Sequence, residues 1–266
     1  MSKSPLIYFK IFSFALRNHK LLEFLNLKLE KLKDSSKRKR KEEYKRVMQS
    51  EEETLSQLFP DKRFDPVLFN DLERHLDDFI EKQRHKKYPS IENPYPVDFA
   101  LDRDVGRLLA YLCMYYQPEV VIETGVANGF STSYILFGLE TIGKGKLISF
   151  DYLILPWHTK EKVGLAIPNS LRHRHILKVG NAATELKQYL RNVDSIDIFL
   201  HDSSHTYKNM MEEFHIAWPH IKKGGFLLSD DVHKHDAFLD FSDEVKKTPL
   251  VISKTSYGGC FGIIQK

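Results

Sequence analysis

The stretch VVIETGVANGFST, residues Val120–Thr132, indicates how the chain folds. Its first three residues are an apolar run typical of a buried strand, and a helix is predicted over Ser131–Leu139. Gly125 and Gly129 lie between the two, and glycine allows a tight turn and a close approach of the backbone to a ligand. The amides that open the helix can bind an anionic group. The stretch therefore predicts a strand–turn–helix unit, with either a ligand site or plain glycine packing at its turn.

An acidic residue distinguishes this turn from a dinucleotide-binding site. The pattern is E-x-G-x-x-x-G, with Glu123 two residues before the first glycine, whereas dinucleotide-binding enzymes carry G-x-G-x-x-G. A carboxylate attracts a cationic ligand and repels a pyrophosphate. The spacing therefore disfavours an oxidoreductase with a nicotinamide cofactor and favours a cationic ligand.

Apolar runs alternate with helix-like stretches after this unit. Strands are predicted over Leu147–Phe150, His175–Val179, Ile196–Leu200 and Gly225–Leu228, and helices over Asp104–Tyr116, Ala183–Leu190 and Tyr207–Ile221. Such alternation predicts a mostly parallel sheet that is covered on both faces. Near the C-terminus, the runs Val251–Ser256 and Cys260–Ile264 flank Tyr257-Gly258-Gly259, which is a hairpin signal. We therefore expect the sheet to end in an antiparallel strand.

The N-terminal part of the chain has a different character, and we predict a helical extension over residues 1–85, followed by an α/β domain over residues 86–266. Leucines between Leu21 and Leu32 recur at three- and four-residue steps, the period of a buried helix stripe. Asp65–Gln83 is predicted to be a second amphipathic helix. The nearly all-charged stretch Lys33–Glu53 is either a solvated helix or a linker.

Composition limits the partners and the location. The chain has a net charge of +4 and two cysteines, which argues against a disulfide framework and for a reducing, cytoplasmic compartment. The basic run Lys37–Lys41 is either a solvated face or a contact with nucleic acid or anionic lipid, with nucleic acid the less favoured partner. Pro5–Leu16 is too short to span a membrane and is interrupted by Lys10. It predicts either a helix packed on the domain or on a second subunit, as in a homodimer, or a helix in peripheral contact with a membrane.

Polar residues follow the predicted strands at their carboxyl ends, where open α/β sheets bind ligands. Asp151 ends the second strand, where a carboxylate can accept hydrogen bonds from both ribose hydroxyls of a nucleoside. Asp202 and His205 follow the fourth strand, and Asp230 and Asp231 follow the fifth. We expect these side chains to meet at one edge of the sheet.

Three converging carboxylates, those of Asp202, Asp230 and Asp231, repel one another unless a cation or protons intervene. Mg²⁺ accepts such oxygen ligands and lowers the pKa of a bound hydroxyl. The sequence therefore predicts a Mg²⁺ site, with His205 as the base and His201 as an alternative base. In a purely structural interpretation, Asp230 and Asp231 cap the following helix or accept backbone amides.

The motifs VVIETGVANGFST, ISFD, GLAIPNSLRHRHILKVGNA, IDIFLHDSSHTYKNMMEEF and AWPHIKKGGFLLSDDV occur in this order. With them, the segment from Val97 to Ile264 resembles the class I S-adenosylmethionine-dependent methyltransferases. Within that class it resembles the small-molecule and sugar O-methyltransferase-like group that is often filed with cephalosporin-hydroxylase-type proteins. The resemblance implies an α/β fold with a doubly wound, mostly parallel, seven-stranded Rossmann-like sheet and an antiparallel C-terminal strand. Residues 1–85 match no family that we can name.

The resemblance also implies roles for individual residues. The first motif surrounds the methionine part of S-adenosylmethionine, which implies Glu123, Gly125, Gly129 and Ser131, and Asp151 holds the ribose. Asn181 stands where relatives commonly have aspartate, and as a donor and acceptor it is expected to contact adenine. The acids Asp202, Asp230 and Asp231 resemble the metal ligands of catechol O-methyltransferase-like enzymes, and His205 is implied as base or substrate contact.

The expected function is therefore O-methylation of a hydroxyl group on a sugar or other small molecule, with S-adenosylmethionine as cofactor and with Mg²⁺ assistance. The alternative is a domain that binds the cofactor or a glycan without turnover and acts in an assembly through its N-terminal helices. The basic run Lys37–Lys41 motivates that alternative.

Overall fold

The computed structural model describes residues 5–18, 20–34, 40–97, 101–255 and 259–266. Within them, eight strands form one sheet in the order β1-β7-β8-β6-β5-β2-β3-β4. The strands are β1 (Met48–Gln49), β2 (Val120–Thr124), β3 (Lys146–Asp151), β4 (His175–Val179), β5 (Ile196–His201), β6 (Ile221–Ser229), β7 (Leu250–Ser253) and β8 (Cys260–Gln265). Strand β8 is antiparallel to both of its neighbours, and every other pair of adjacent strands is parallel. The predicted class and the antiparallel C-terminal strand are confirmed.

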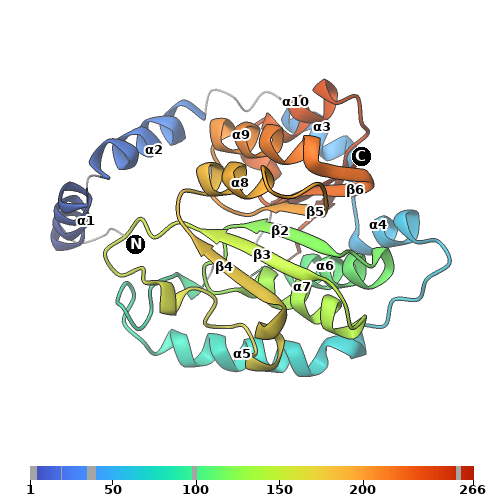
Figure 1. Ribbon diagram of the computed structural model, residues 1–266, viewed down its shortest axis with the longest axis horizontal. Coiled ribbons are helices and arrows are strands. Elements are labelled where there is room, and N and C mark those ends of the chain that lie inside the picture. Colours follow the sequence, from blue (N-terminus) through green and yellow to red (C-terminus); the bar gives the residue numbers. More distant parts are fainter. Residues whose placement is uncertain (1–4, 19, 35–39, 98–100, 256–258) are drawn as a thin grey trace.

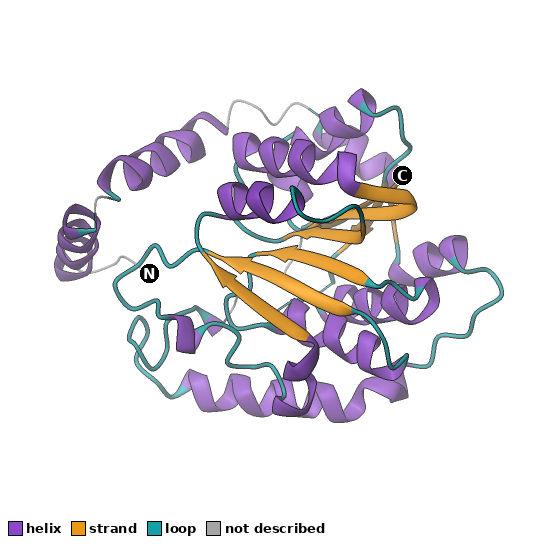
Figure 2. Cartoon of the chain, viewed as in Figure 1, coloured by secondary structure: helices purple, strands orange, loops and turns teal. Residues whose placement is uncertain are grey.

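Helices cover both faces of the sheet, as the apolar strands require. Figure 1 shows α5 (Asn70–Arg84), α6 (Arg103–Tyr116) and α7 (Phe130–Thr141) on one face. The helices α8 (Ala182–Leu190), α9 (Tyr207–Ala217) and α10 (Ala237–Glu244) cover the other face. Each set packs its buried side chains on the strands in its own hydrophobic core. The doubly wound arrangement is therefore confirmed, and Figure 2 shows its layers.

Two boundaries differ from the sequence prediction. The helix predicted to reach Ile221 ends at Ala217, and a short 3₁₀ turn, Trp218–His220, leads into β6. Pro219 explains this end, because proline lacks the amide that would continue the helical bonding. Strand β6 therefore begins at Ile221, earlier than predicted, with an irregular register opposite Ile196–Ile198.

The C-terminal hairpin is antiparallel as expected, but its first strand is shorter than predicted and ends at Ser253. The predicted turn residues Tyr257 and Gly258 lie outside the described residues. The eighth strand, β1, was not expected at all. It has only two residues, too few to show a period in the sequence, and it comes from the charged stretch that we interpreted as a solvated helix or a linker.

The N-terminal region forms α1 (Pro5–Arg17), α2 (Leu21–Asp34), α3 (Lys41–Val47) and α4 (Glu51–Leu58). Tyr44 of α3 and Leu55 of α4 are buried in the two cores of the sheet. The helix predicted over Asp65–Gln83 is present as a 3₁₀ turn, Pro66–Phe69, which continues into α5. The division at residue 85 remains a prediction.

The leucine stripe of α2 was expected to be buried, and this is wrong. Leu22 is 75% exposed and Leu29 is 53% exposed. The period of the stripe is helical, but helical period alone does not say which partner covers the face. No described helix is long and apolar enough to cross a bilayer.

Candidate functional site

A cavity of about 620 Å³ opens at the carboxyl ends of β2, β3, β5 and β6. Its lining includes residues at the ends of these strands, Leu27 of α2 and Lys254 beyond β7. This edge is where open α/β sheets bind their ligands. A second cavity, of about 570 Å³, lies between α8 and α9 and takes no residue from the strand ends.

The turn after β2 is built from glycine for steric reasons. Gly125 has a φ of +85°, in the left-handed region, and a Cβ there would collide with the backbone carbonyl of Asp202. Gly129 has a φ of +90°, and a Cβ there would press on Ile167 and Gly164. Gly125 lines the cavity, whereas Gly129 packs against the following loop. Of the two predicted cofactor glycines, the structure thus brings Gly125 to the cavity wall.

Glu123 is fully buried beneath the cavity floor. Its carboxylate accepts hydrogen bonds from the hydroxyls of Ser131 at 2.6 Å, Thr132 at 2.8 Å and Ser149 at 2.7 Å. Burial raises the pKa of Glu123 to about 7, and the three hydroxyl donors oppose this shift. Glu123 does not line the cavity, whereas its partner Ser131 does.

Asp151 ends β3 and does line the cavity. Its Oδ2 atom accepts hydrogen bonds from the backbone amides of Val126 at 2.9 Å and Ala127 at 3.0 Å. Burial raises the pKa of Asp151, and these amides oppose the shift. The carboxylate therefore fixes the glycine turn while it faces the cavity.

Asn181 occupies a different place from the one expected for an adenine contact. Its Oδ1 atom accepts from the amide of Thr184 at 3.2 Å, so the side chain caps the N-terminus of α8. The next residue, Ala182, lines the cavity in its place. An aspartate or asparagine before a helix is a common cap, which was an available signal in the sequence.

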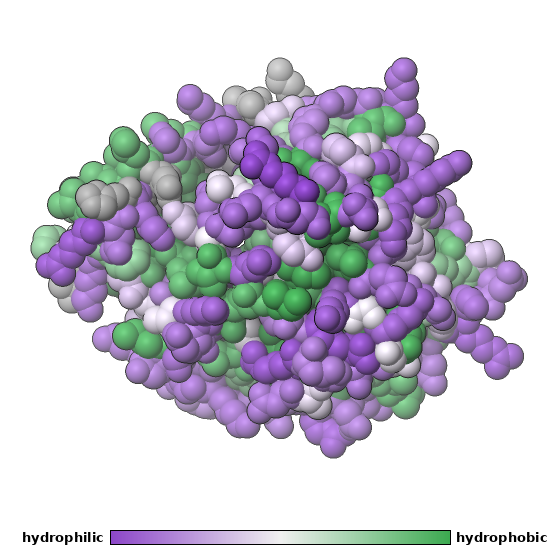
Figure 3. Space-filling model, in the orientation of Figure 1, coloured by the Kyte–Doolittle hydropathy of each residue, from purple (hydrophilic) through white to green (hydrophobic). Residues whose placement is uncertain are grey.

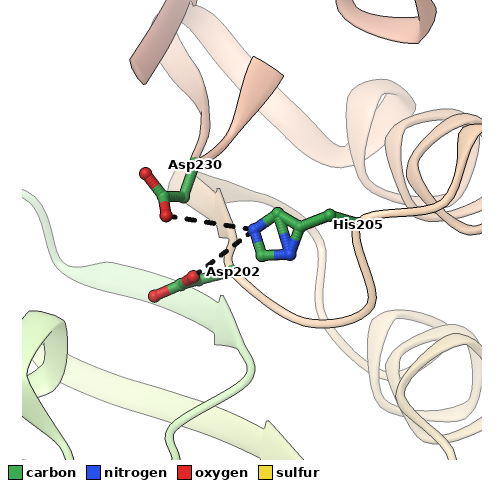
Figure 4. Close-up of side chains that lie close together, drawn as sticks. All are labelled: Asp202, His205 and Asp230. Carbon is green, nitrogen blue, oxygen red and sulfur yellow. Dashed lines mark ion pairs between the residues drawn. The ribbon is translucent and has the colours of Figure 1, made fainter. Parts of the chain in front are cut away.

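The predicted acidic residues do meet, and His205 stands among them. The Nε2 atom of His205 lies 3.7 Å from Asp202 Oδ1, 3.9 Å from Asp230 Oδ2 and 3.8 Å from Asp231 Oδ2. Figure 4 shows His205 pointing between Asp202 and Asp230, each of which comes from a different strand end. All four side chains line the cavity.

Lys254 is a residue of this site that the sequence did not indicate. Its ammonium lies 2.6 Å from Asp230 Oδ1 and 2.9 Å from Asp231 Oδ1, and its side chain is only 9% exposed. Lys234 contacts Asp231 from the other side. Lys254 comes just after β7, 23 residues beyond Asp231, and only the hairpin that returns beside β6 brings it to the cluster.

Burial shifts the pKa of Asp202 and the pKa of His205 in opposite directions. Burial raises the pKa of Asp202 well above its usual range, and Asp230 adds to the shift. Burial also lowers the pKa of His205 well below 6.5, with the nearby His201 and Lys234 acting in the same sense. His205 is therefore a neutral imidazole near pH 7, which is the form that can accept a proton.

His201, the alternative base, has a structural position instead. It is fully buried, and its Nδ1 lies 2.7 Å from Glu213 Oε2. Glu213 also accepts hydrogen bonds from Thr124 and from Ser203 at 2.8 Å. This network joins β2, β5 and α9 below the cavity, so of the two candidate bases only His205 lines the cavity.

The chain can be compared with known proteins on this basis. Residues 122–232 match the family model described as "Methyltransferase domain". The chain matches no curated protein sequence. Among the solved structures that share its fold are three proteins of low identity to this chain. They are an O-methyltransferase from Bacillus cereus in complex with S-adenosylhomocysteine, the methyltransferase PaMTH1 from Podospora anserina bound to S-adenosylhomocysteine, and the O-methyltransferase TomG from Streptomyces achromogenes in complex with S-adenosylmethionine.

The three alignments span most of both chains. The Bacillus protein is 15% identical, with 80% of this chain and 96% of that chain covered and a TM-score of 0.54. PaMTH1 is 14% identical, with 80% of this chain and 94% of that chain covered and a TM-score of 0.52. TomG is 17% identical, with 82% of this chain and 99% of that chain covered and a TM-score of 0.53. The matched family segment contains every predicted site residue, from Glu123 to Asp231.

Proposed function

We propose that the chain is a class I S-adenosylmethionine-dependent methyltransferase, whose sheet-edge cavity binds S-adenosylmethionine and which methylates a hydroxyl group of a sugar or other small molecule. The match of residues 122–232 to a methyltransferase-domain model supports the proposal, as does the fold that the chain shares with O-methyltransferases of known structure. The observation that carries the proposal is a neutral His205 among acids, in a cavity that Gly125 and Asp151 also line. Two of the proteins with the same fold are O-methyltransferases whose structures contain the cofactor or its demethylated product.

On the cofactor side, Asp151 would hold the ribose hydroxyls, because it ends β3 and faces the cavity. The turn at Gly125 would approach the methionine part, since a glycine lets the backbone come close. Glu123 supports this side from below through Ser131, rather than contacting the ligand itself. Asn181 would act by starting α8, whose first residue, Ala182, lies at the cavity wall.

The reaction itself is a displacement in line with the bond between sulfur and the methyl carbon. The acceptor oxygen forms a bond to that carbon, the electrons of the carbon–sulfur bond remain on sulfur, and the neutral product S-adenosylhomocysteine is released. A neutral hydroxyl is a poor nucleophile, so a base is needed. His205 takes the hydroxyl proton, and the carboxylate of Asp231, 3.8 Å from Nε2 of His205, stabilises the imidazolium that results.

Two of the three aspartates expected to bind Mg²⁺ are paired with lysines. Lys254 contacts both Asp230 and Asp231, and Lys234 also contacts Asp231. We infer that the Lys254 ammonium supplies the positive charge that these neighbouring carboxylates require. A second candidate keeps Mg²⁺ assistance, because ligand atoms of Asp202, His205 and Asp230 lie within 4.8 Å of one another.

Release of S-adenosylhomocysteine from a panel of hydroxylated acceptors tests the proposal. We expect turnover that survives exhaustive chelation and that falls at least about a hundredfold in His205→Ala, the size of a general-base contribution. If chelation abolished turnover and Mg²⁺ restored it, the result would favour Mg²⁺ over the Lys254 ammonium as the cation of the site. Cofactor binding without release of product for any acceptor would favour a binding domain over an enzyme.

A further inference from the structure

The helices α1 and α2 expose an unusual amount of apolar surface. Of thirteen large hydrophobic side chains that are exposed in the described residues, seven belong to these two helices. We call them the α1–α2 surface, and they are Phe9, Phe12, Leu16, Leu22, Leu25, Leu29 and Leu32. Their exposed fractions run from 47% at Leu25 to 75% at Leu22. Figure 3 shows green, hydrophobic atoms at the upper left, over α1 and α2. Clustered exposure of this kind marks an interaction site.

Charge favours an anionic partner for the N-terminal region that carries this surface. Residues 1–41 contain twelve lysine and arginine residues and three acidic residues, a net charge of +9. The whole chain carries only +4, so the remaining residues carry −5. Lys10 and Arg17 of α1 are exposed beside the apolar side chains. Basic residues that flank an apolar helix face are typical of helices that lie on an anionic lipid surface. Helix α1 carries Lys10 and Arg17 and no acidic residue, so two copies of α1 placed against each other would repel.

The same helices lie against the mouth of the cavity. The ammonium of Lys20 donates to the carbonyl of Leu153 at 3.0 Å, just after β3. The amide of Tyr207, at the start of α9, donates to Asp34 Oδ2 at 3.0 Å. Between these two attachments, Leu27 of α2 lines the cavity. Figure 1 shows α1 and α2 on the side toward which the arrowheads of β3 and β4 point, the ligand-binding edge of the sheet.

We propose that the α1–α2 surface docks on a membrane surface rich in anionic lipids, and that the methyl acceptor is an amphiphile whose hydroxylated head group enters the cavity from that surface. The second half of this statement rests on the proposed function, whereas the docking does not. One helix pair then serves both purposes, because its apolar side chains enter the lipid while Leu27 borders the site. The arrangement selects acceptors that are held at an interface over acceptors that are free in water.

Flotation of the full-length protein with lipid vesicles tests the docking. We expect binding to vesicles of phosphatidylcholine mixed with phosphatidylglycerol, weak binding to phosphatidylcholine alone, and release by high salt, which screens the basic charges. Phe12→Glu and Leu22→Glu should each lower the partition coefficient about tenfold or more, since each removes one large apolar side chain from the lipid. Val67→Glu is the matched control, because Val67 is 65% exposed but lies outside the α1–α2 surface.

Equal binding of all three variants, or no binding to anionic vesicles, would overturn the docking. The docking would also be overturned if light scattering showed a dimer of the native protein and a monomer of Leu22→Glu, because a second copy of the chain would then cover the surface. A Phe12→Trp variant adds a direct readout, in which quenching by brominated lipid is expected and its absence counts against insertion.

Two further measurements separate the docking from the proposed function. S-adenosylhomocysteine binding in the absence of vesicles should be unchanged in Leu22→Glu, because Leu22 lies outside the cavity. Vesicle binding without cofactor binding would contradict the proposed function and would still support the docking. For the acceptor class, Leu22→Glu should slow methylation of a vesicle-embedded glycolipid about tenfold and leave that of its water-soluble head group unchanged. Equal effects on both would contradict an acceptor drawn from the membrane.

Discussion

Replacing Lys254 by methionine removes a positive charge from the acidic cluster while nearly preserving the volume of the side chain. In the native protein the ammonium lies 2.6 Å from Asp230 and 2.9 Å from Asp231. All three side chains are at most 19% exposed. Lys254→Met therefore leaves two neighbouring carboxylates in a site from which water is largely excluded.

The magnitude follows from this burial. Removing one partner of a buried ion pair typically costs about 3–5 kcal/mol of folding free energy. We expect a loss of about 3 kcal/mol at pH 8, the low end of that range, because the cavity admits some water. The loss should shrink toward pH 5. Burial raises the pKa of Asp230 above 3.8 even with Lys254 present, and the variant should raise it further.

The direction of the pH effect can be derived explicitly. An aspartate whose pKa is raised in the folded state keeps its proton where the unfolded chain has already lost it. Its contribution to stability is therefore greatest below 3.8 and is lost as pH rises through the folded pKa. The deficit of Lys254→Met relative to the native protein should accordingly be larger at pH 8 than at pH 5.

Urea denaturation of both proteins at the two pH values measures this deficit. Lys144→Met is the matched control, because Lys144 forms a surface pair with Glu119 at 3.4 Å and should cost less than about 1 kcal/mol. Adding Asp230→Asn to Lys254→Met should recover part of the loss. A deficit below about 1 kcal/mol, or one that is the same at both pH values, would refute Lys254 as the cation of the site.

Three other perturbations test separate parts of the site. Gly125→Ala forces a side chain into the left-handed region and against Asp202, so it should cost about 2–3 kcal/mol by urea denaturation and abolish the thermal shift with S-adenosylhomocysteine. Gly143→Ala, at a φ of +69° with open space around it, should cost about 1 kcal/mol and leave the shift intact. In the pH profile of kcat/KM, the midpoint of the loss of activity on the acid side should lie below pH 6.5, because burial lowers the pKa of His205. A midpoint at or above pH 6.5 would contradict the role of His205 as the base. Burial raises the pKa of Glu123 from 4.5 to about 7 in the folded protein. Folding should therefore become about 3 kcal/mol less favourable as pH rises from 4.5 to 7. This dependence of stability on pH should be missing in Glu123→Gln.

Patterns along the chain were sufficient to predict every described strand of the sheet except β1. Short apolar strands alternate with helices of helical period, and Gly125 marks the turn at which the first strand ends. Because the carboxyl ends of parallel strands meet at one edge, the pattern alone places residues together that are far apart in the sequence. Asp202, His205 and Asp230 do converge there.

Other features depend on contacts that no local pattern reveals. Lys254 reaches Asp230 only because β8 folds back between β6 and β7. Glu123 and Asp151 both follow the expected pattern, yet one is buried under three hydroxyls and the other faces the cavity. The exposed leucines of α2 show the same limit, since their period predicts a helix but not what covers it.

Titration calorimetry with S-adenosylhomocysteine, on the native protein and on Asp151→Asn, is the most direct test that this edge of the sheet recognises a sulfur-containing nucleoside. We predict one site per chain in the native protein and an affinity at least about tenfold lower in the variant, because the amide replaces an acceptor-only carboxylate with a group that also donates. No heat of binding to the native protein, or equal affinity in both proteins, would contradict the assignment.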